Sequence, residues 1–184
     1  MEGMSTAAAL LTVEDFLRLP EKEGVKQELC EGVLVEMGGA ALGHEIVKSN
    51  FIALLSVFLR DHRVARVFSE TMFVLSQGEA YIADVSVVLL ERLRDRSRQE
   101  VFEGAPDLAI EVVSSETAAR LETKVRGYLR SGSKAVWVAY PEQRTVRAHS
   151  PDGSSRCLEQ EQTLDGGDLL PGFQAPISQI FEGV

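Results

Sequence analysis

Two segments of the sequence read as β-strands that each carry a single carboxylate in an otherwise apolar run. Tyr81 to Leu90 contains Asp84, and Asp107 to Val113 contains Glu111. Their β-branched residues favour strands, and a carboxylate buried inside a strand is costly unless it is paired or binds a cation. Because strands that follow each other in the chain are often neighbours in a sheet, we expect the two carboxylates to lie close together.

Two carboxylates side by side repel each other, and a divalent ion between them would keep both ionised. The alternative is that each carboxylate caps the end of a strand or pairs with an arginine. Asp107 is a poorer partner for Glu111, because four residues of one strand separate them by about 13 Å. We expect Asp107 to end a loop.

The periodicity of apolar residues predicts an α/β protein with a mixed sheet flanked by helices and with additional β-hairpins. The strand–helix–strand order across 107–140 predicts one parallel strand pair. Residues 91–104 read as a charged loop. The expected helices are 12–19, 42–61, 114–131 and 177–181, and the expected strands are 26–30, 33–37, 64–69, 71–75, 81–90, 107–113, 135–140 and 145–149.

The length of 184 residues fits one domain, for which we expect a flexible N-terminus over 1–11 and a folded unit over 12–184. No apolar run approaches the roughly 20 residues of a membrane-spanning helix, so no membrane partner is expected. Two cysteines are too few for a disulfide framework, which favours reduced thiols and a cytoplasmic location.

The net charge of −9 argues at first sight against a nucleic-acid-binding protein. The charge is unevenly distributed, since residues 46–134 hold 13 Lys and Arg against 12 Asp and Glu. The acidic excess therefore lies at the two ends of the chain, and the cations lie in the middle with the two carboxylate-bearing strands.

Lys124 and Tyr128 lie four residues apart on the helix that follows Glu111, so they share one face of it. If that helix packs on the sheet, Lys124 would point at the two carboxylates. There it would orient or deprotonate a water, or stabilise developing negative charge. The alternative is a solvated lysine beside Glu122 and Arg126.

His44 opens the helix over 42–61, where it could contact a phosphate, or it could simply start the helix. Glu28 and Glu31 stand on a polar hairpin and are expected to be solvated. An arginine run in the expected loop reads either as phosphate contacts or as a solvated segment; it consists of Arg92, Arg94, Arg96 and Arg98. Walker A, Gly-x-Ser-x-Gly, His-Glu-x-x-His and Cys-x-x-Cys motifs are absent from the sequence.

The order of several short segments is more specific than any one of them. The segments are Glu28-Leu-Cys-Glu-Gly-Val-Leu-Val, His44, Ala83-Asp-Val-Ser-Val-Val, Gly104-Ala-Pro-Asp-Leu-Ala-Ile-Glu-Val-Val-Ser, Lys124 with Tyr128, Val136-Trp-Val and Leu169-Leu-Pro-Gly-Phe. In this order they resemble the Uma-type endonuclease family over about residues 12–182. That family is a branch of the PD-(D/E)XK restriction-endonuclease-like superfamily.

The resemblance implies a restriction-endonuclease-like fold and a Mg²⁺- or Mn²⁺-dependent endonuclease that acts on DNA. By motif, Asp84, Glu111 and the carbonyl of Val112 would bind the metal, Lys124 would assist, and Glu28, His44 and Tyr128 would be accessory. Many nucleases that cut two strands are dimers, so a homodimer is expected.

The sequence departs from the pattern of the superfamily at three positions. Ala83 replaces a proline, Val113 stands where the E-x-K signature has lysine, and Tyr140 stands where an Asp-Pro often begins. The helix lysine Lys124 would take the role of the missing strand lysine.

Three functions are compatible with these residues. The first is the metal-dependent endonuclease. The second is a catalytically inactive protein of the same fold that binds nucleic acid or protein. The third is a metal-free hydrolase with Asp84 and Glu111 as acid and base, which requires the two carboxylates to have unequal environments.

Overall fold

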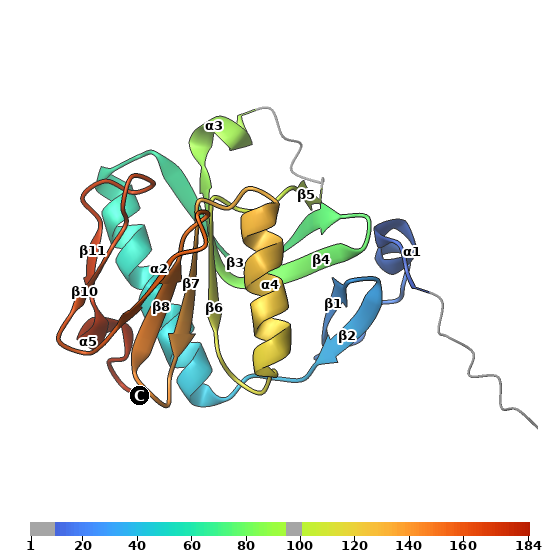
Figure 1. Cartoon of the computed structure of the whole chain (residues 1–184), viewed down its shortest axis with the longest axis horizontal. Coiled ribbons are helices and arrows are strands. Elements are labelled where there is room, and N and C mark those ends of the chain that lie inside the picture. The colour runs from blue at the N-terminus through green and yellow to red at the C-terminus, as the bar shows by residue number, and fades with distance from the viewer. Residues whose placement is uncertain (1–9, 95–100) are drawn as a thin grey trace, which may run out of the picture.

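The computed structural model of the chain describes residues 10–94 and 101–184. Its centre is a nine-stranded mixed sheet with helices on both faces (Figure 1). The helices are α1 (Val13–Leu17), α2 (Leu42–Asp61), α3 (Leu90–Leu93), α4 (Ala118–Arg130) and α5 (Ile177–Ile180). The strands are β1 (Lys26–Cys30), β2 (Val33–Met37), β3 (Ala65–Ser76), β4 (Glu79–Leu89), β5 (Phe102–Glu103), β6 (Leu108–Val112), β7 (Ala135–Tyr140), β8 (Thr145–His149), β9 (Ser155–Leu158), β10 (Thr163–Asp165) and β11 (Gln174–Pro176).

The strand order in the large sheet is β2-β1-β4-β6-β7-β8-β9, and β3 joins it by pairing with β4 and β5. The strand β6 pairs antiparallel with β4 and parallel with β7, and α4 connects the two parallel strands. The predicted α/β class, the mixed sheet and its parallel pair are therefore confirmed.

The two long helices cover opposite faces of the sheet, with α4 in front of it and α2 behind it in Figure 1. Phe51 and Leu55 of α2 are fully buried in a core that also holds Trp137. By length and composition α2 is the one helix among the described residues that could cross a membrane. Its apolar side lies instead against the sheet.

The second core lies under α4 and holds Leu121, Val125 and Tyr128. Gly127 makes a close approach between α4 and β4 possible, because a Cβ there would lie 2.8 Å from Cε2 of Tyr81. The absence of a side chain at this position lets the helix sit deep on the sheet.

Local signals placed several boundaries correctly. The side chain of Thr12 caps α1 in a capping box with Asp15. Glu31 and Gly32 form the hairpin turn between β1 and β2 with positive φ angles of 50° and 79°. The backbone N–H of Leu11 donates to the carbonyl of Gly32, and residues 1–9 of the expected flexible N-terminus lie outside the described residues.

Three expectations about secondary structure were wrong. The strands expected at 64–69 and 71–75 are one strand, β3, which continues through Glu70 although that residue has a positive φ of 49°. The loop expected at 91–104 contains the end of α3 and the short strand β5. The segment 150–176, to which no element was assigned, contains β9, β10 and β11.

Candidate functional site

The pairing of β4 with β6 places Asp84 opposite Glu111. The strands are antiparallel and Val85 pairs with Ile110. Asp84, which precedes Val85, therefore lies opposite Glu111, which follows Ile110. Both carboxylates are buried, with exposed fractions of 7% and 2%. The backbone N–H of Val112 donates to Oδ2 of Asp84 at 2.9 Å. The expectation that the two carboxylates are neighbours is confirmed.

Two side chains of α4 hold both oxygens of Glu111. Nζ of Lys124 donates to Oε2 at 2.8 Å, and the hydroxyl of Tyr128 donates to Oε1 at 2.9 Å. Lys124 is 2% exposed and Tyr128 is fully buried. The helix therefore aims both side chains at the carboxylates, as expected from their spacing of four residues, and the alternative of a solvated lysine is wrong.

Glu28 of β1 completes the surroundings of Lys124, because its Oε1 accepts a hydrogen bond from Nζ at 3.0 Å. The same oxygen accepts the backbone N–H of Ile82, and Oε2 accepts from Arg120 at 2.9 Å. Glu28 is fully buried, so the expectation that it is solvated was wrong. The reason is that β1 pairs with β4 at Leu29, which turns Glu28 under α4.

Asp84 is also held by cations from two other elements. Nε2 of His44 lies 3.1 Å from Oδ2 of Asp84, and Nδ1 of the same ring lies 3.2 Å from Oε1 of Glu45. Nζ of Lys26 lies 3.4 Å from Oδ1 of Asp84. His44 therefore reaches the carboxylate pair from the start of α2, and it is buried there.

These contacts close into a ring through β3 and α2. Nζ of Lys26 lies 2.9 Å from Oε1 of Glu70, which is 2.7 Å from Nζ of Lys48. Nζ of Lys48 lies 2.5 Å from Oε2 of Glu45. The six residues alternate acid and base, and we call them the charge ring: Asp84, Lys26, Glu70, Lys48, Glu45 and His44.

The two central carboxylates have opposite electrostatic environments. Burial alone would raise the pKa of Asp84, but the hydrogen bonds from His44 and Val112 outweigh burial and lower it to about 2. Burial raises the pKa of Glu111 above the ordinary value, against the attraction of Lys124. Burial favours the neutral amine of Lys124, but Glu111 and Glu28 outweigh this and raise its pKa above the ordinary value.

A cavity of about 240 Å³ opens onto this arrangement. Asp84, Glu111, Val112 and Lys124 line it together with Glu116, which sequence reasoning missed. Oε2 of Glu116 is a buried oxygen without a hydrogen-bond partner among the described residues. Burial raises the pKa of Glu116. A buried oxygen of this kind is usually satisfied by a water or an ion.

The donors at this cavity fit Mg²⁺ or Mn²⁺. Within residues 10–94 and 101–184, no three His, Cys, Asp or Glu side chains are grouped as a complete metal cage. Mg²⁺ needs only one or two carboxylates and keeps several waters, whereas a structural Zn²⁺ needs four protein ligands. Asp84, Glu111 and the carbonyl of Val112 would suffice for the former.

Arg92, in the arginine run, contacts other residues than Asp84 and Glu111. Nη1 of Arg92 is 3.1 Å from Oδ2 of Asp107, and its guanidinium also lies over the ring of Phe102. Asp107 precedes β6, as expected for the end of a loop, and it accepts the backbone N–H of Leu89. Arg94 is exposed, and Arg96 and Arg98 lie outside the described residues.

Two spacings in the sequence could have revealed more of the site. Arg120 precedes Lys124 by four residues, so it extends the face of α4 that carries Lys124 and Tyr128. Lys48 follows His44 by four residues on α2. Nothing local marks Lys26, Glu70 or Glu116, because their contacts join residues from separate elements.

The mixed sheet with helices on both faces and a pocketed carboxylate pair defines a restriction-endonuclease-like protein. The Uma2 family, described as "Putative restriction endonuclease", matches residues 13–178. The chain therefore belongs to the Uma2 family, and the resemblance found in the sequence is confirmed.

A solved structure supports the fold. It is a "putative nuclease belonging to DUF820" from Anabaena variabilis, which superposes on this chain with a TM-score of 0.84 at 22% identity. The match covers 93% of this chain and 97% of that one. A search of the curated proteins finds no match.

Proposed function

We propose that this member of the Uma2 family is a Mg²⁺- or Mn²⁺-dependent endonuclease that hydrolyses phosphodiester bonds of DNA. The observation that carries the proposal is the arrangement of Asp84 and Glu111, two buried carboxylates on neighbouring strands that line one cavity with a buried lysine. Membership of a family of nucleases supports a nucleic acid as the substrate.

In this proposal Asp84, Glu111 and the carbonyl of Val112 hold the metal. A bound divalent ion polarises a scissile phosphate and lowers the pKa of a coordinated water. His44 and the N–H of Val112 fix the orientation of Asp84, and Tyr128 fixes that of Glu111. These three groups are positioning residues, because they act through the carboxylates.

Lys124 serves in this proposal as a fixed cation. An ammonium has three N–H donors, and Glu28 and Glu111 accept two of them. The third is available to a water or phosphate oxygen in the cavity that Lys124 lines. The two carboxylates keep the amine protonated, so stabilisation of negative charge fits it better than removal of a proton.

Nicking of supercoiled plasmid in Mg²⁺ or Mn²⁺ tests the proposal. Wild-type protein should nick, whereas Asp84→Asn and Glu111→Gln should not, and both variants should lose Mn²⁺ binding in calorimetric titration. Glu122→Gln is the matched control, because Glu122 is exposed on α4. Equal nicking by all four proteins would refute the assignment.

A binding module with the same fold is the second candidate. The charge ring favours it, because Lys26 and His44 already neutralise Asp84, and so does the net charge of −9. Such a protein would bind nucleic acid or another protein but would show no metal-dependent nicking. The plasmid assay combined with a binding assay therefore separates the two candidates.

The metal-free hydrolase receives less support from the geometry. The environments of Asp84 and Glu111 are unequal, as that mechanism requires. However, the ammonium of Lys124 and the hydroxyl of Tyr128 both donate to Glu111, which favours its ionised form over a proton donor. Cleavage that persists in EDTA would favour this candidate.

Two expectations remain predictions. Sedimentation should show a homodimer if the protein cuts both strands, and a monomer would contradict this. Both cysteines are free, so thiol titration without denaturant should detect the exposed Cys157, in keeping with reduced thiols and a cytoplasmic location.

A further inference from the structure

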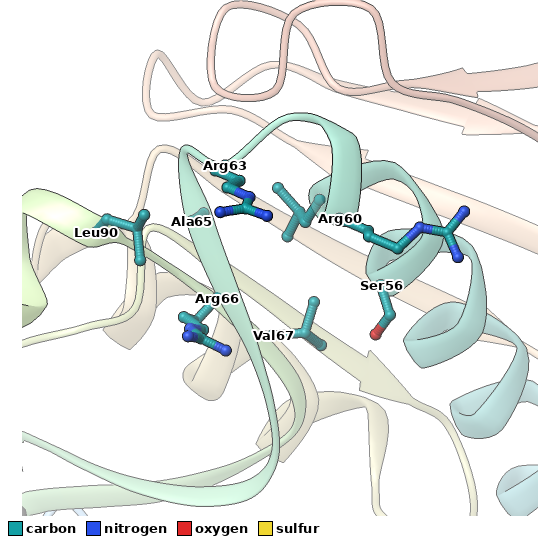
Figure 2. A pocket seen from close by; sticks show the side chains of 8 residues that line it. Ser56, Arg60, Arg63, Ala65, Arg66, Val67 and Leu90 are labelled. Carbon is teal, nitrogen blue, oxygen red and sulfur yellow. The ribbon is translucent and has the colours of Figure 1, made fainter.

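A second cavity, of about 560 Å³, lies at the other end of α2 from the carboxylates. Figure 2 shows Ser56 and Arg60 on the last turns of α2 and Arg66 on β3, with Arg63 on the connection between them. We call Arg60, Arg63 and Arg66 with this cavity the arginine pocket. Three guanidinium groups from consecutive parts of the chain thus share one hollow.

The positive charge of the arginine pocket is almost uncompensated. Arg63 and Arg66 are exposed and form no ion pair with any residue in 10–94 or 101–184. Arg60 has only Asp61, at 3.7 Å, and both of these side chains are more than two-thirds exposed. Since like charges repel, such a cluster in a chain of net charge −9 indicates an anionic ligand.

The chemistry of the pocket fits the sugar–phosphate backbone of a nucleic acid. Guanidinium groups donate two parallel hydrogen bonds to a phosphate, which suits them to this ligand better than ammonium groups. The floor of the cavity is apolar, with Leu59 and Ala65 buried beneath the arginines and Leu90 beside them. Such a floor can pack against the carbon atoms of a sugar.

The distance between the pocket and the carboxylates is fixed by α2. His44 and Arg60 lie on the same helix, sixteen residues apart. At 1.5 Å per residue this is roughly 24 Å. One strand of a duplex rises 3.4 Å per nucleotide, so this distance spans about seven nucleotides. The strand β3 links the same two places, since Arg66 lies in the pocket and Glu70 lies in the charge ring.

We propose that the arginine pocket binds backbone phosphates of the substrate about seven nucleotides from the scissile bond. This inference rests on the proposed function and adds the second point at which the nucleic acid is held. It follows that a duplex too short to reach from the cavity of Asp84 to the pocket cannot contact both places at once.

Equilibrium binding in EDTA tests the inference without cleavage. The probes are a fluorescent duplex of about 24 base pairs and a fluorescent hairpin with a stem of about 5 base pairs, chosen to span and not to span both places. The variant is Arg63→Gln with Arg66→Gln. The control is Arg126→Gln with Arg156→Gln, which removes the same charge from exposed arginines elsewhere. Thermal melting checks that all proteins are folded.

The pocket variant should bind the long duplex about tenfold more weakly than wild type, with a salt slope reduced by about two. The control should change far less, and wild type should bind the short hairpin more weakly than the long duplex, because the hairpin cannot contact both places at once. Equal affinity and slope for wild type and the pocket variant, or an equal loss in the control, overturns the inference.

Plasmid nicking in Mg²⁺ by the same proteins separates this inference from the proposed function. If the wild-type protein nicks the plasmid but duplex binding is unchanged when Arg63 and Arg66 are replaced, the inference is overturned and the proposed nuclease function stands. If duplex binding depends on these arginines but the protein does not nick the plasmid, the arginine pocket is supported and the proposed nuclease function is overturned. A wild-type protein that binds neither duplex overturns the inference.

Discussion

Val112 holds the carboxylate of Asp84 through its backbone N–H, at 2.9 Å, across the boundary between β6 and β4. The orientation of the acid is thus determined by the sheet itself. This matters for mutagenesis, because an amide at position 84 can still accept the same hydrogen bond from Val112 while losing the negative charge.

We therefore predict that Asp84→Asn keeps its fold and loses its metal. The loss of Mn²⁺ affinity should exceed the roughly 10–100-fold effect of removing a supporting residue. Calorimetric titration with Mn²⁺ measures this, and circular dichroism checks the fold. Wild-type Mn²⁺ affinity in the variant would remove Asp84 from the metal site.

Lys124→Met should slow single-turnover cleavage while leaving Mn²⁺ affinity nearly unchanged. It should also destabilise the fold by about 3–5 kcal/mol, because Glu111 becomes a buried carboxylate without a cation while Glu28 keeps only Arg120. Urea unfolding measures the second effect. Unchanged single-turnover cleavage in the variant would contradict the role of Lys124.

His44→Ala should lower activity by about 10–100-fold, as expected for a residue that orients a metal ligand. The reason is that Asp84 keeps its hydrogen bond from Val112 but loses the ring nitrogen at 3.1 Å. His149→Ala on β8 is the control. If the cleavage rates of His44→Ala and His149→Ala both equal that of wild type, His44 does not position Asp84 and only begins α2.

Glu79 provides a test of stability against pH away from the candidate site. Burial raises its pKa, but hydrogen bonds from Arg130, Tyr81 and Ser76 outweigh burial and hold the pKa below the usual range. The ionised form therefore stabilises the folded chain above the ordinary carboxyl pKa of about 4.3. This contribution is lost as the pH falls through the lowered pKa.

Urea unfolding of wild type and Glu79→Gln between about pH 7 and pH 3 measures the contribution. The difference in the free energy of unfolding between the two proteins should be largest near neutral pH and should shrink as the solution becomes acidic. Glu122→Gln, whose carboxylate is exposed, should follow the wild-type curve. A difference that does not change with pH would contradict the assignment.

The sequence predicted the fold where one element carries its own signal. The helical periodicity of α2 and α4, the Glu31-Gly32 turn and the apolar strands β4 and β6 all depend on residues close in the chain. The prediction was wrong at Glu70, where a gap between two strands was expected. The ladder with β4 on both sides keeps β3 continuous there.

The candidate site could be predicted only in part for a related reason. Asp84 and Glu111 stood out because they interrupt apolar runs, and Lys124 with Tyr128 because of their helical spacing. Glu28 looked solvated, since its burial depends on β1 lying beside β4. The contacts of Lys26, Glu70 and Lys48 join three elements and leave no local pattern.

Gly127 has a consequence for how tolerant this protein is to change. It lies three residues after Lys124 and directly before Tyr128, where α4 touches Tyr81. Even a single methyl group there would wedge the helix away from the sheet and pull the ammonium and the phenol off Glu111 together. The charge balance of the cavity thus depends on an uncharged position that does not line it.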